Sequence, residues 1–222
     1  WINSTSYRWY IEWDRAYEAL EWAEEVMDDF QKCLKYRDFQ KAIIALSVCI
    51  EYLIVWLQDV DDSAWEYWWY IIELLESMLP LLVESIETNW SEKDRKVCIQ
   101  EFLSLSKKKK IDGFGFEVYI LEALVELAGG SSYRLFEKTI KELQERDSYN
   151  NFSIIEYKLL SKLWDHDTIN NFIQKKAWEY KFIEFYADQL IAEKQYEWAE
   201  NLLIPFLNQE NFYQKSWVLE KL

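Results

Sequence analysis

The chain has few of the residues that sheet proteins need for their turns. It contains only 4 glycines and 2 prolines among 222 residues. Sheet proteins of this size use many turn glycines, so the scarcity favours long helices joined by short connections. The sequence therefore predicts an all-α protein.

Histidine and cysteine are also scarce, which limits the chemistry that the chain can perform. His166 is the single histidine, and Cys33, Cys49 and Cys98 form no C-x-x-C pair. Metal sites need three or four converging ligands, and most catalytic triads need a histidine. We therefore expect no metal, no cofactor and no catalytic residue. Because the cysteines lie in apolar helical surroundings, we interpret them as reduced core thiols of a cytoplasmic protein.

Positive charge is the third shortage. Lysine and arginine number 25 against 40 aspartates and glutamates, which gives a formal net charge of −15. Such a field repels phosphate backbones, so we expect no direct binding to nucleic acid. The one basic run, Lys107 to Lys110, is interpreted as a solvated loop.

No segment satisfies our criteria for a membrane anchor. The most apolar window, Ala42 to Leu57, is interrupted by Ser47 and Glu51. We judge it too short and too polar to cross a bilayer, and the start of the chain has no signal-peptide pattern. Because the chain opens on Trp1 and ends inside a predicted helix, we expect it to be part of a longer polypeptide.

Hydrophobic residues make up 50% of the chain, and their spacing is helical. From Ile183 to Phe206, two apolar stripes are separated by Glu193-Lys194-Gln195, a pattern typical of an antiparallel helical hairpin. We expect small Ala187 and Ala199 to let the two helices approach, with Tyr196 and Trp198 filling the gaps beside them. Neither helix can bury its stripe alone, so such hairpins must stack.

The same spacing predicts about ten helices. The others are expected at Trp9–Tyr36, Phe39–Val60, Ser63–Thr88, Ser91–Ser106, Phe116–Ala128, from Ser131 or Ser132 to Arg146, Phe152–Trp164, Thr168–Trp178 and Phe212–Leu222. Within them, Pro80 should kink its helix near Ser77, and Asp167 should cap the helix that follows it.

The fold expected from this pattern is an α-solenoid of stacked antiparallel hairpins. The polar loop after Arg146 divides it into an N-terminal helical bundle, residues 1–147, and tetratricopeptide-like hairpins, residues 148–222, continuous with the bundle and truncated at the C-terminus. The turns at Asp165–Asp167 and Glu193–Gln195 lie about 28 residues apart. The period of a tetratricopeptide repeat is about 34 residues.

Aromatic residues exceed what one core can hold. Trp65, Tyr67, Trp68, Trp69 and Tyr70 crowd one predicted helix and must point in several directions. Since tryptophan and tyrosine dominate interface hot spots, some of them are candidates for a contact surface and the rest for the core. The candidate partner-binding residues are Trp65, Trp68, Trp69, Tyr180 and Trp198.

Several stretches occur in the order of a known family. They are Asp14-Arg15-Ala16-Tyr17, Ala42 to Leu57, Asp59-Val60-Asp61-Asp62-Ser63, Tyr133-Arg134-Leu135 and Tyr157 to Phe206. Together they resemble the all-helical region that follows the zinc finger in bacterial SWIM zinc-finger proteins. The resemblance implies a helical scaffold, with nucleic-acid or protein association through the finger. The family's C-x-C…C-x-H motif is absent, so no zinc ligand is carried over; either the finger precedes Trp1 or the protein keeps only the helical region.

These patterns favour a non-enzymatic scaffold. We expect it to bind a peptide, a helix or a protein subunit through an aromatic-rich, acidic helical surface. The alternative is an accessory subunit of a nucleoprotein complex, in a defence system or mobile element, that docks on a basic protein through acidic faces. An enzyme using carboxylates alone is the third hypothesis, for which the sequence nominates no converging pair.

Overall fold

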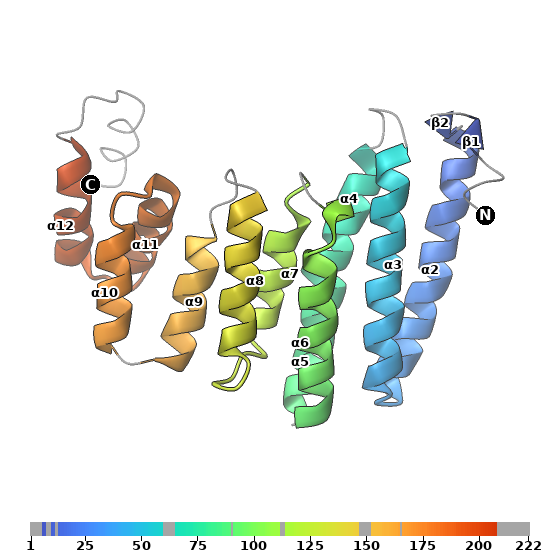
Figure 1. The fold of residues 1–222 in the computed structure, drawn as a ribbon, viewed down its shortest axis with the longest axis horizontal. Coiled ribbons are helices and arrows are strands. Elements are labelled where there is room, and N and C mark those ends of the chain that lie inside the picture. The colour runs from blue at the N-terminus through green and yellow to red at the C-terminus, as the bar shows by residue number, and fades with distance from the viewer. Residues whose placement is uncertain are drawn as a thin grey trace. The chain divides into compact units, whose positions relative to one another are not determined.

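The computed structural model describes residues 6–7, 10–11, 13–59, 65–89, 91–111, 114–146, 152–164 and 166–207. Within these ranges the all-α prediction is confirmed, since antiparallel helices pack side by side within each compact unit (Figure 1). The chain divides into two compact units, residues 1–150 and 151–222, which we call the first unit and the second unit. The boundary expected from the sequence lies at residues 147–148.

The first unit contains seven of the α-helices in the described residues. They are α2 (Trp13–Lys35), α3 (Phe39–Asp59), α4 (Trp65–Glu73), α5 (Leu79–Thr88), α6 (Glu92–Ser106), α7 (Phe116–Val125) and α8 (Tyr133–Arg146). A π-helical turn, η1 (Leu74–Met78), joins α4 directly to α5, and a 3-10 turn, η2 (Lys109–Ile111), follows α6. A continuous helical segment therefore runs from α4 through η1 to α5, as the sequence predicts.

The first helix begins later than its apolar spacing predicts. Strand β1 (Ser6–Tyr7) pairs antiparallel with β2 (Tyr10–Ile11), and Tyr7 lies opposite Tyr10. Helix α2 therefore starts at Trp13, and the predicted start at Trp9 is wrong. Aromatic and β-branched residues such as Tyr10 and Ile11 suit a strand as well as a helix, so spacing alone misplaces this boundary.

Helices α2 and α3 are joined by a turn whose hydrogen bonds define a Schellman motif. The Asp38 N–H donates to the Cys33 carbonyl oxygen over 2.9 Å, and the Arg37 N–H donates to the Leu34 carbonyl oxygen over 3.0 Å. Arg37 has a φ of 59°, the left-handed conformation that this motif usually assigns to glycine. The turn reverses the chain without a glycine, in keeping with the low glycine content.

Pro80 follows the π-helical turn. The Leu79 N–H donates to the carbonyl oxygen of Leu74, five residues earlier, instead of four. Proline has no N–H to donate, and irregular helical turns are common beside it. The hydrogen-bond pattern thus changes over Leu74–Met78, and the kink predicted near Ser77 stays a prediction.

Helix α3 is the central helix of the first unit. It contacts α2, α4, α5 and α6, although Ile44 and Val48 on one side are 57% and 47% exposed. Its stretch Phe39–Leu57 has a mean hydropathy of 1.7 and is long and apolar enough to cross a membrane, so the judgement that this region is too short and too polar is wrong. A buried core helix passes the same test, and 56% of the stretch is buried inside the protein.

The core of the first unit is rich in large side chains. The fully buried aromatic residues here are Phe30, Trp56, Phe102, Phe116 and Phe136. They come from five helices, so burial in this unit depends on contacts between hairpins as well as within them. Ser91 caps α6 by accepting a hydrogen bond from the Asp94 N–H.

The second unit contains four α-helices among its described residues. They are α9 (Ser153–Leu163), α10 (His166–Lys176), α11 (Tyr180–Ala192) and α12 (Tyr196–Leu207). Helix α9 contacts α10 and α11, and α11 contacts α12. One cluster of its core consists of Phe182, Ile183, Ala187 and Leu203, with partly buried Tyr157, Phe172 and Tyr186 packed against it.

The turn between α11 and α12 has the same hydrogen bonds as the turn between α2 and α3. The Gln195 N–H donates to the Leu190 carbonyl oxygen over 2.8 Å, and the Lys194 N–H donates to the Ile191 carbonyl oxygen over 3.0 Å. Lys194 has a φ of 61°. Both units therefore close a hairpin with a Schellman motif that holds a basic residue at the left-handed position.

The packing predicted for this hairpin is half correct. Ala187 and Ala199 are buried, but Tyr196 and Trp198 are 62% and 71% exposed, so the expectation that they fill interhelical gaps is wrong. Trp198 lies roughly 100° around the helix from Ala199 and therefore points away from the α11 contact. Tyr196 is the first residue of α12 and lies at the turn.

The predicted N-cap before α10 is also misplaced. The helix begins at His166, so Asp167 lies in its first turn. An acidic residue there stabilises the helix through the macrodipole instead of by capping. Asp165 is outside the described residues.

Candidate interaction groove

Three of the five nominated aromatic residues belong to α4. The Trp65 side chain lies outside the part of the chain that the structure describes. Trp68 is half-buried, and its ring centroid lies 6.4 Å from that of buried Phe116 on α7. Trp69 meets the Trp68 ring edge-on at 5.1 Å and is 60% exposed. Trp68 therefore packs α4 against α7, while Trp69 is a surface residue.

The other two nominated residues belong to the second unit. Tyr180 is half-buried at the start of α11, and burial, with a smaller contribution from the Glu184 charge, raises its pKa. Trp198 is exposed and lines a groove. Trp178, which is not among the nominated residues, is 76% exposed in the turn after α10.

The groove has a volume of about 440 Å³ and receives side chains from all four described helices of the second unit. Its apolar lining consists of Ile169, Ile173, Leu190 and Trp198, and its polar lining consists of Tyr157, Ser161, His166, Asn170, Tyr186, Gln189, Glu193 and Gln195. Pockets that bind ligands typically combine an apolar lining with a few placed polar groups. The volume also falls in the usual range of about 300–1,000 Å³.

Two phenols and one carboxylate set the electrostatics of the groove. The rings of Tyr157 and Tyr186 meet edge-on with centroids 5.4 Å apart. Burial raises the pKa of Tyr157, and the Glu193 charge adds to this, while a hydrogen bond with Ser161 opposes it. Burial also raises the pKa of Tyr186, again with Glu193 contributing. Both phenols thus remain protonated at neutral pH and can donate hydrogen bonds.

The charge inside the groove is negative. Glu193 is the only acidic residue in the lining within the described residues, and the lining includes no lysine or arginine. The Glu193 carboxylate accepts a hydrogen bond from the Gln195 amide at 2.9 Å. A cationic side chain entering here would find a carboxylate beside it and apolar surface for its aliphatic stem.

The amide side chains suit a peptide backbone. Asn170, Gln189 and Gln195 each offer a donor and an acceptor, which can pair with the N–H and C=O of an extended segment. Trp198 at the groove supplies a large, rigid apolar surface. The arrangement can therefore bind a short peptide that carries a basic residue beside an apolar one.

His166 has a polar neighbour within its own helix. The His166 side chain is exposed, and its Nδ1 lies 2.9 Å from the Asn170 side-chain nitrogen. Across the described ranges, no group of three His, Cys, Asp or Glu residues could hold a metal ion. His166 thus contributes a polar group to the groove.

The cysteines differ in their burial. Cys49 and Cys98 are buried, and burial raises the pKa of Cys49 to about 12 and also raises that of Cys98. Cys33 is only half-buried, so it is not the core thiol that its sequence surroundings suggest. The two buried thiols are held in their unreactive, protonated form.

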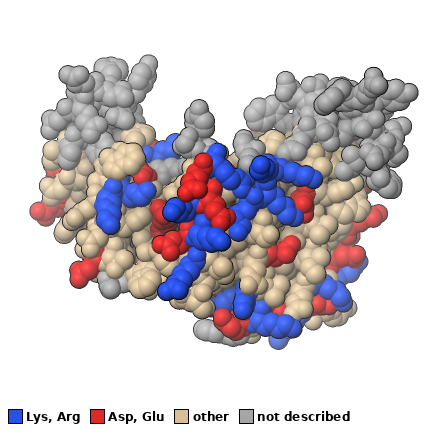
Figure 2. All heavy atoms as spheres, viewed as in Figure 1, with Lys and Arg blue, Asp and Glu red and all other residues tan. Residues whose placement is uncertain are grey.

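The basic run does not behave as a fully solvated loop. Lys108 Nζ lies 2.6 Å from a Glu51 carboxylate oxygen, and Lys107 Nζ lies 3.5 Å from one of Glu142. Arg146 donates to the Lys107 carbonyl oxygen over 2.6 Å. These contacts connect the end of α6 to α3 and α8, and basic side chains gather over α6 and α8 on the face shown in Figure 2. Local basicity thus exists on an acidic protein.

Sequence reasoning missed most of the groove. Asn170, Gln189 and Gln195 are ordinary surface residue types, and nothing in their spacing marks them as neighbours. The signal that was available is the short α11–α12 turn, which brings Glu193 and Gln195 next to α9 and α10 only after the hairpins pack.

No known family model, curated protein or solved structure matches the chain.

Proposed function

We propose that the protein is a non-enzymatic interaction scaffold whose second unit binds a peptide segment of a partner protein. The observation that carries this proposal is the groove of about 440 Å³ with Trp198, 71% exposed, in its lining. Exposed tryptophan beside polar groups able to pair with a backbone is the composition of a peptide-binding surface. The tetratricopeptide-like character of the second unit and the relation to SWIM zinc-finger proteins stay predictions.

The groove favours a basic partner segment. Glu193 supplies a negative charge without a neighbouring lysine or arginine in the described lining, and the whole chain carries −15. A peptide with lysine or arginine beside an aliphatic or aromatic residue would satisfy both the carboxylate and Trp198. This chemistry fits the basic protein partner expected from the sequence.

The test begins with a random peptide library panned against the whole chain. Enriched peptides are expected to share a basic residue next to an apolar one. In fluorescence anisotropy titrations, Trp198→Ala should weaken their binding by about tenfold or more, the usual size of a tryptophan hot spot. Glu193→Gln should weaken the binding of peptides that contain the basic residue. It should leave the binding of a variant peptide without that residue unchanged.

Trp178→Ala is the matched control, since Trp178 is equally exposed but does not line the groove. Trp69→Ala tests the surface of α4 that the sequence nominated. If Trp178→Ala and Trp198→Ala weaken binding equally, or if no peptides are enriched, the proposal is wrong.

The acidic face of α2 supports a second candidate, docking of a basic protein subunit such as one in a nucleoprotein complex. Its exposed acidic residues include Glu21, Glu24, Glu25 and Asp28. Assembly through such a face weakens steeply as salt is raised. Replacing Glu21, Glu24 and Glu25 by glutamine would abolish that salt dependence, whereas binding through the groove would survive the change.

A further inference from the structure

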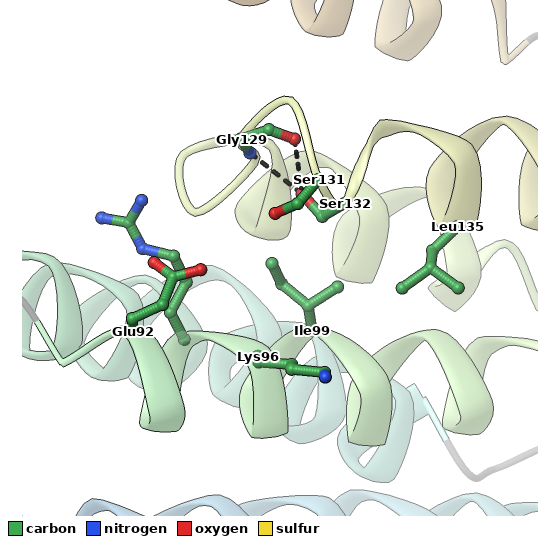
Figure 3. Close-up of a pocket in the computed structure, with 8 residues that line it drawn as sticks. Glu92, Lys96, Ile99, Gly129, Ser131, Ser132 and Leu135 are labelled. Atoms are coloured by element: carbon green, nitrogen blue, oxygen red, sulfur yellow. Dashed lines mark hydrogen bonds between the residues drawn. The ribbon is translucent and has the colours of Figure 1, made fainter.

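The first unit contains a second hollow with the opposite charge. It measures about 460 Å³ and lies between the first half of α6 and the turn that leads into α8 (Figure 3). Ile99 and Leu135 form its apolar part, and Arg95, Lys96 and Ser131 contribute polar groups. We call it the α6–α8 cleft.

The apolar part of the cleft comes from two helices. Ile99 is 2% exposed and belongs to α6, while Leu135 is 41% exposed and belongs to α8. Figure 3 shows both side chains pointing into the space between the helices. Leu135 therefore offers apolar surface that the fold itself leaves uncovered.

Arg95 and Lys96 form no ion pair with another residue in the described part of the chain. Glu92 stands three residues before Arg95 and four before Lys96, the spacings at which helical ion pairs form. No side-chain hydrogen bond or ion pair joins these three residues to one another or to any other residue in the described part of the chain. By contrast, two other pairs three residues apart form ion pairs. Lys32 Nζ lies 2.8 Å from Asp29 Oδ1, and Lys41 Nζ lies 2.7 Å from Asp38 Oδ2.

The turn before α8 has two serine hydroxyl groups. That of Ser132 forms hydrogen bonds within the turn, whereas Ser131 is exposed. The Ser132 hydroxyl accepts from the Gly129 N–H over 2.9 Å and donates to the Gly129 carbonyl oxygen, so it holds the turn together. Ser131 is exposed, and its side chain lies at the cleft in Figure 3. A ligand that reaches Arg95 and Lys96 can therefore also meet a hydroxyl donor.

We propose that the α6–α8 cleft binds a monoanionic carboxylate joined to an aliphatic group. The half-buried Arg95 guanidinium offers two parallel N–H donors to a carboxylate, Lys96 adds charge, and Leu135 with Ile99 covers the aliphatic part. Glu92 at the cleft and the net charge of −15 disfavour dianions such as phosphate monoesters. Either a free aliphatic acid or the C-terminal residue of a peptide supplies this chemistry.

The test titrates the whole chain with four probes by isothermal calorimetry and by NMR of the backbone amides. Hexanoate should bind and shift the amides of residues 92–99 and 129–135. Hexanamide, which lacks the charge, and acetate, which lacks the apolar chain, should each bind at least about tenfold more weakly. N-acetyl-leucine separates the two sources, because it binds more tightly than hexanoate only if a peptide C-terminus is the natural occupant.

Variants then locate the binding. Arg95→Gln should weaken hexanoate binding by about tenfold or more, and Lys96→Gln should weaken it less, because a hydrogen-bonded charge contributes more than a mobile one. Lys93→Gln removes the same charge from the same helix outside the cleft and should change binding little. Thermal melting of each variant shows whether it is folded, and Leu135→Asn tests the apolar part independently of charge.

Three results would overturn the proposal: no binding of hexanoate or N-acetyl-leucine, equal binding of hexanoate and hexanamide, or equal weakening by Lys93→Gln and Arg95→Gln. The cleft lies in the first unit and the peptide groove in the second. Trp198→Ala should therefore leave hexanoate binding intact, and Arg95→Gln should leave peptide binding intact, so failure of one proposal does not imply failure of the other.

Discussion

The two units use the same hairpin turn but cover their helices to different extents. Both units bury phenylalanines completely, such as Phe102 in the first and Phe182 in the second, and both expose tryptophans, such as Trp69 and Trp198. In the second unit, however, α10 has no buried residue, whereas each α-helix described in the first unit has at least one. Apolar spacing along a helix is thus not enough to bury a side chain, since neighbouring helices must also cover it.

The hollows of the two units also differ in the charge of the residues that line them. The groove of the second unit is lined by Glu193 without a lysine or arginine, whereas the α6–α8 cleft of the first unit is lined by Arg95, Lys96 and Glu92. These statements concern the described residues. A net charge of −15 for the chain therefore hides two local sites of opposite sign.

Truncating one aromatic residue in each unit should show the largest contrast. Phe102→Ala removes a fully buried side chain and should lower the free energy of unfolding by about 3–5 kcal/mol, whereas Trp198→Ala should change it by less than about 0.5 kcal/mol. Urea unfolding followed by circular dichroism measures both. Similar losses for the two variants would show that Trp198 is covered in solution.

Enlarging a small residue tests whether the second unit has a tightly packed core of its own. Ala187 is completely buried beside Phe182, Ile183 and Leu203, so Ala187→Leu should destabilise the protein by about 1–3 kcal/mol through overpacking. Ala192→Leu, five residues on and exposed, is the control and should be nearly neutral. Thermal unfolding of both variants compares them, and equal melting temperatures would mean that the core has free space.

Alkaline pH should destabilise the first unit through its buried thiol. Burial raises the pKa of Cys49 from 9.0 to about 12, so the unfolded chain loses this proton at lower pH than the folded chain does. The stability contributed by the neutral thiol is present below about pH 9 and is lost as pH rises towards 12. Between these values the wild type should lose about 1.4 kcal/mol per pH unit relative to Cys49→Ala.

Unfolding free energies at pH 8 and pH 10 for the two proteins supply the measurement for Cys49. The difference between wild type and Cys49→Ala should be constant below pH 9 and should shrink above it. A constant difference at both values would mean that the thiol is accessible to solvent in the folded state.

Glycine at the left-handed position of the shared turn should change the free energy of unfolding equally in both units. This is the smallest of the expected effects. Arg37→Gly and Lys194→Gly should each raise the free energy of unfolding by about 0.5–1 kcal/mol, because glycine adopts the left-handed conformation without strain. Ala192→Gly, two residues before Lys194 in ordinary helical conformation, should instead lose about 1 kcal/mol. If the two turn variants change the free energy of unfolding in opposite directions, the two turns are not equivalent.

Much of the fold could be predicted because the signal is local. The end of α2 at the Tyr36-Arg37-Asp38 turn, the Ser91 cap of α6 and the short α11–α12 connection all follow from residues close in sequence. The errors also have local causes. Tyr10 and Ile11 suit a strand as well as a helix, and the apolar stretch expected at Ala42 to Leu57 begins three residues earlier, at Phe39.

Little of either candidate site could be predicted in the same way. Trp198 was nominated for its residue type, but the Asn170, Gln189 and Gln195 amides around the same groove come from three separate segments. Arg95 and Leu135 were not nominated, since nothing along the chain marks them as neighbours across a cleft.

The sequence by itself determined that the chain is helical, that helices such as α2 and α3 pair through short turns without glycine and that its net charge is strongly negative. These properties depend on residue type and spacing along one segment. Tertiary structure alone decided which aromatic residues are covered, which charges remain unpaired and where the two hollows lie. The physical reason is that burial and ion pairing depend on which segments meet in space, and residues as far apart as Arg95 and Leu135 become neighbours only after the helices pack.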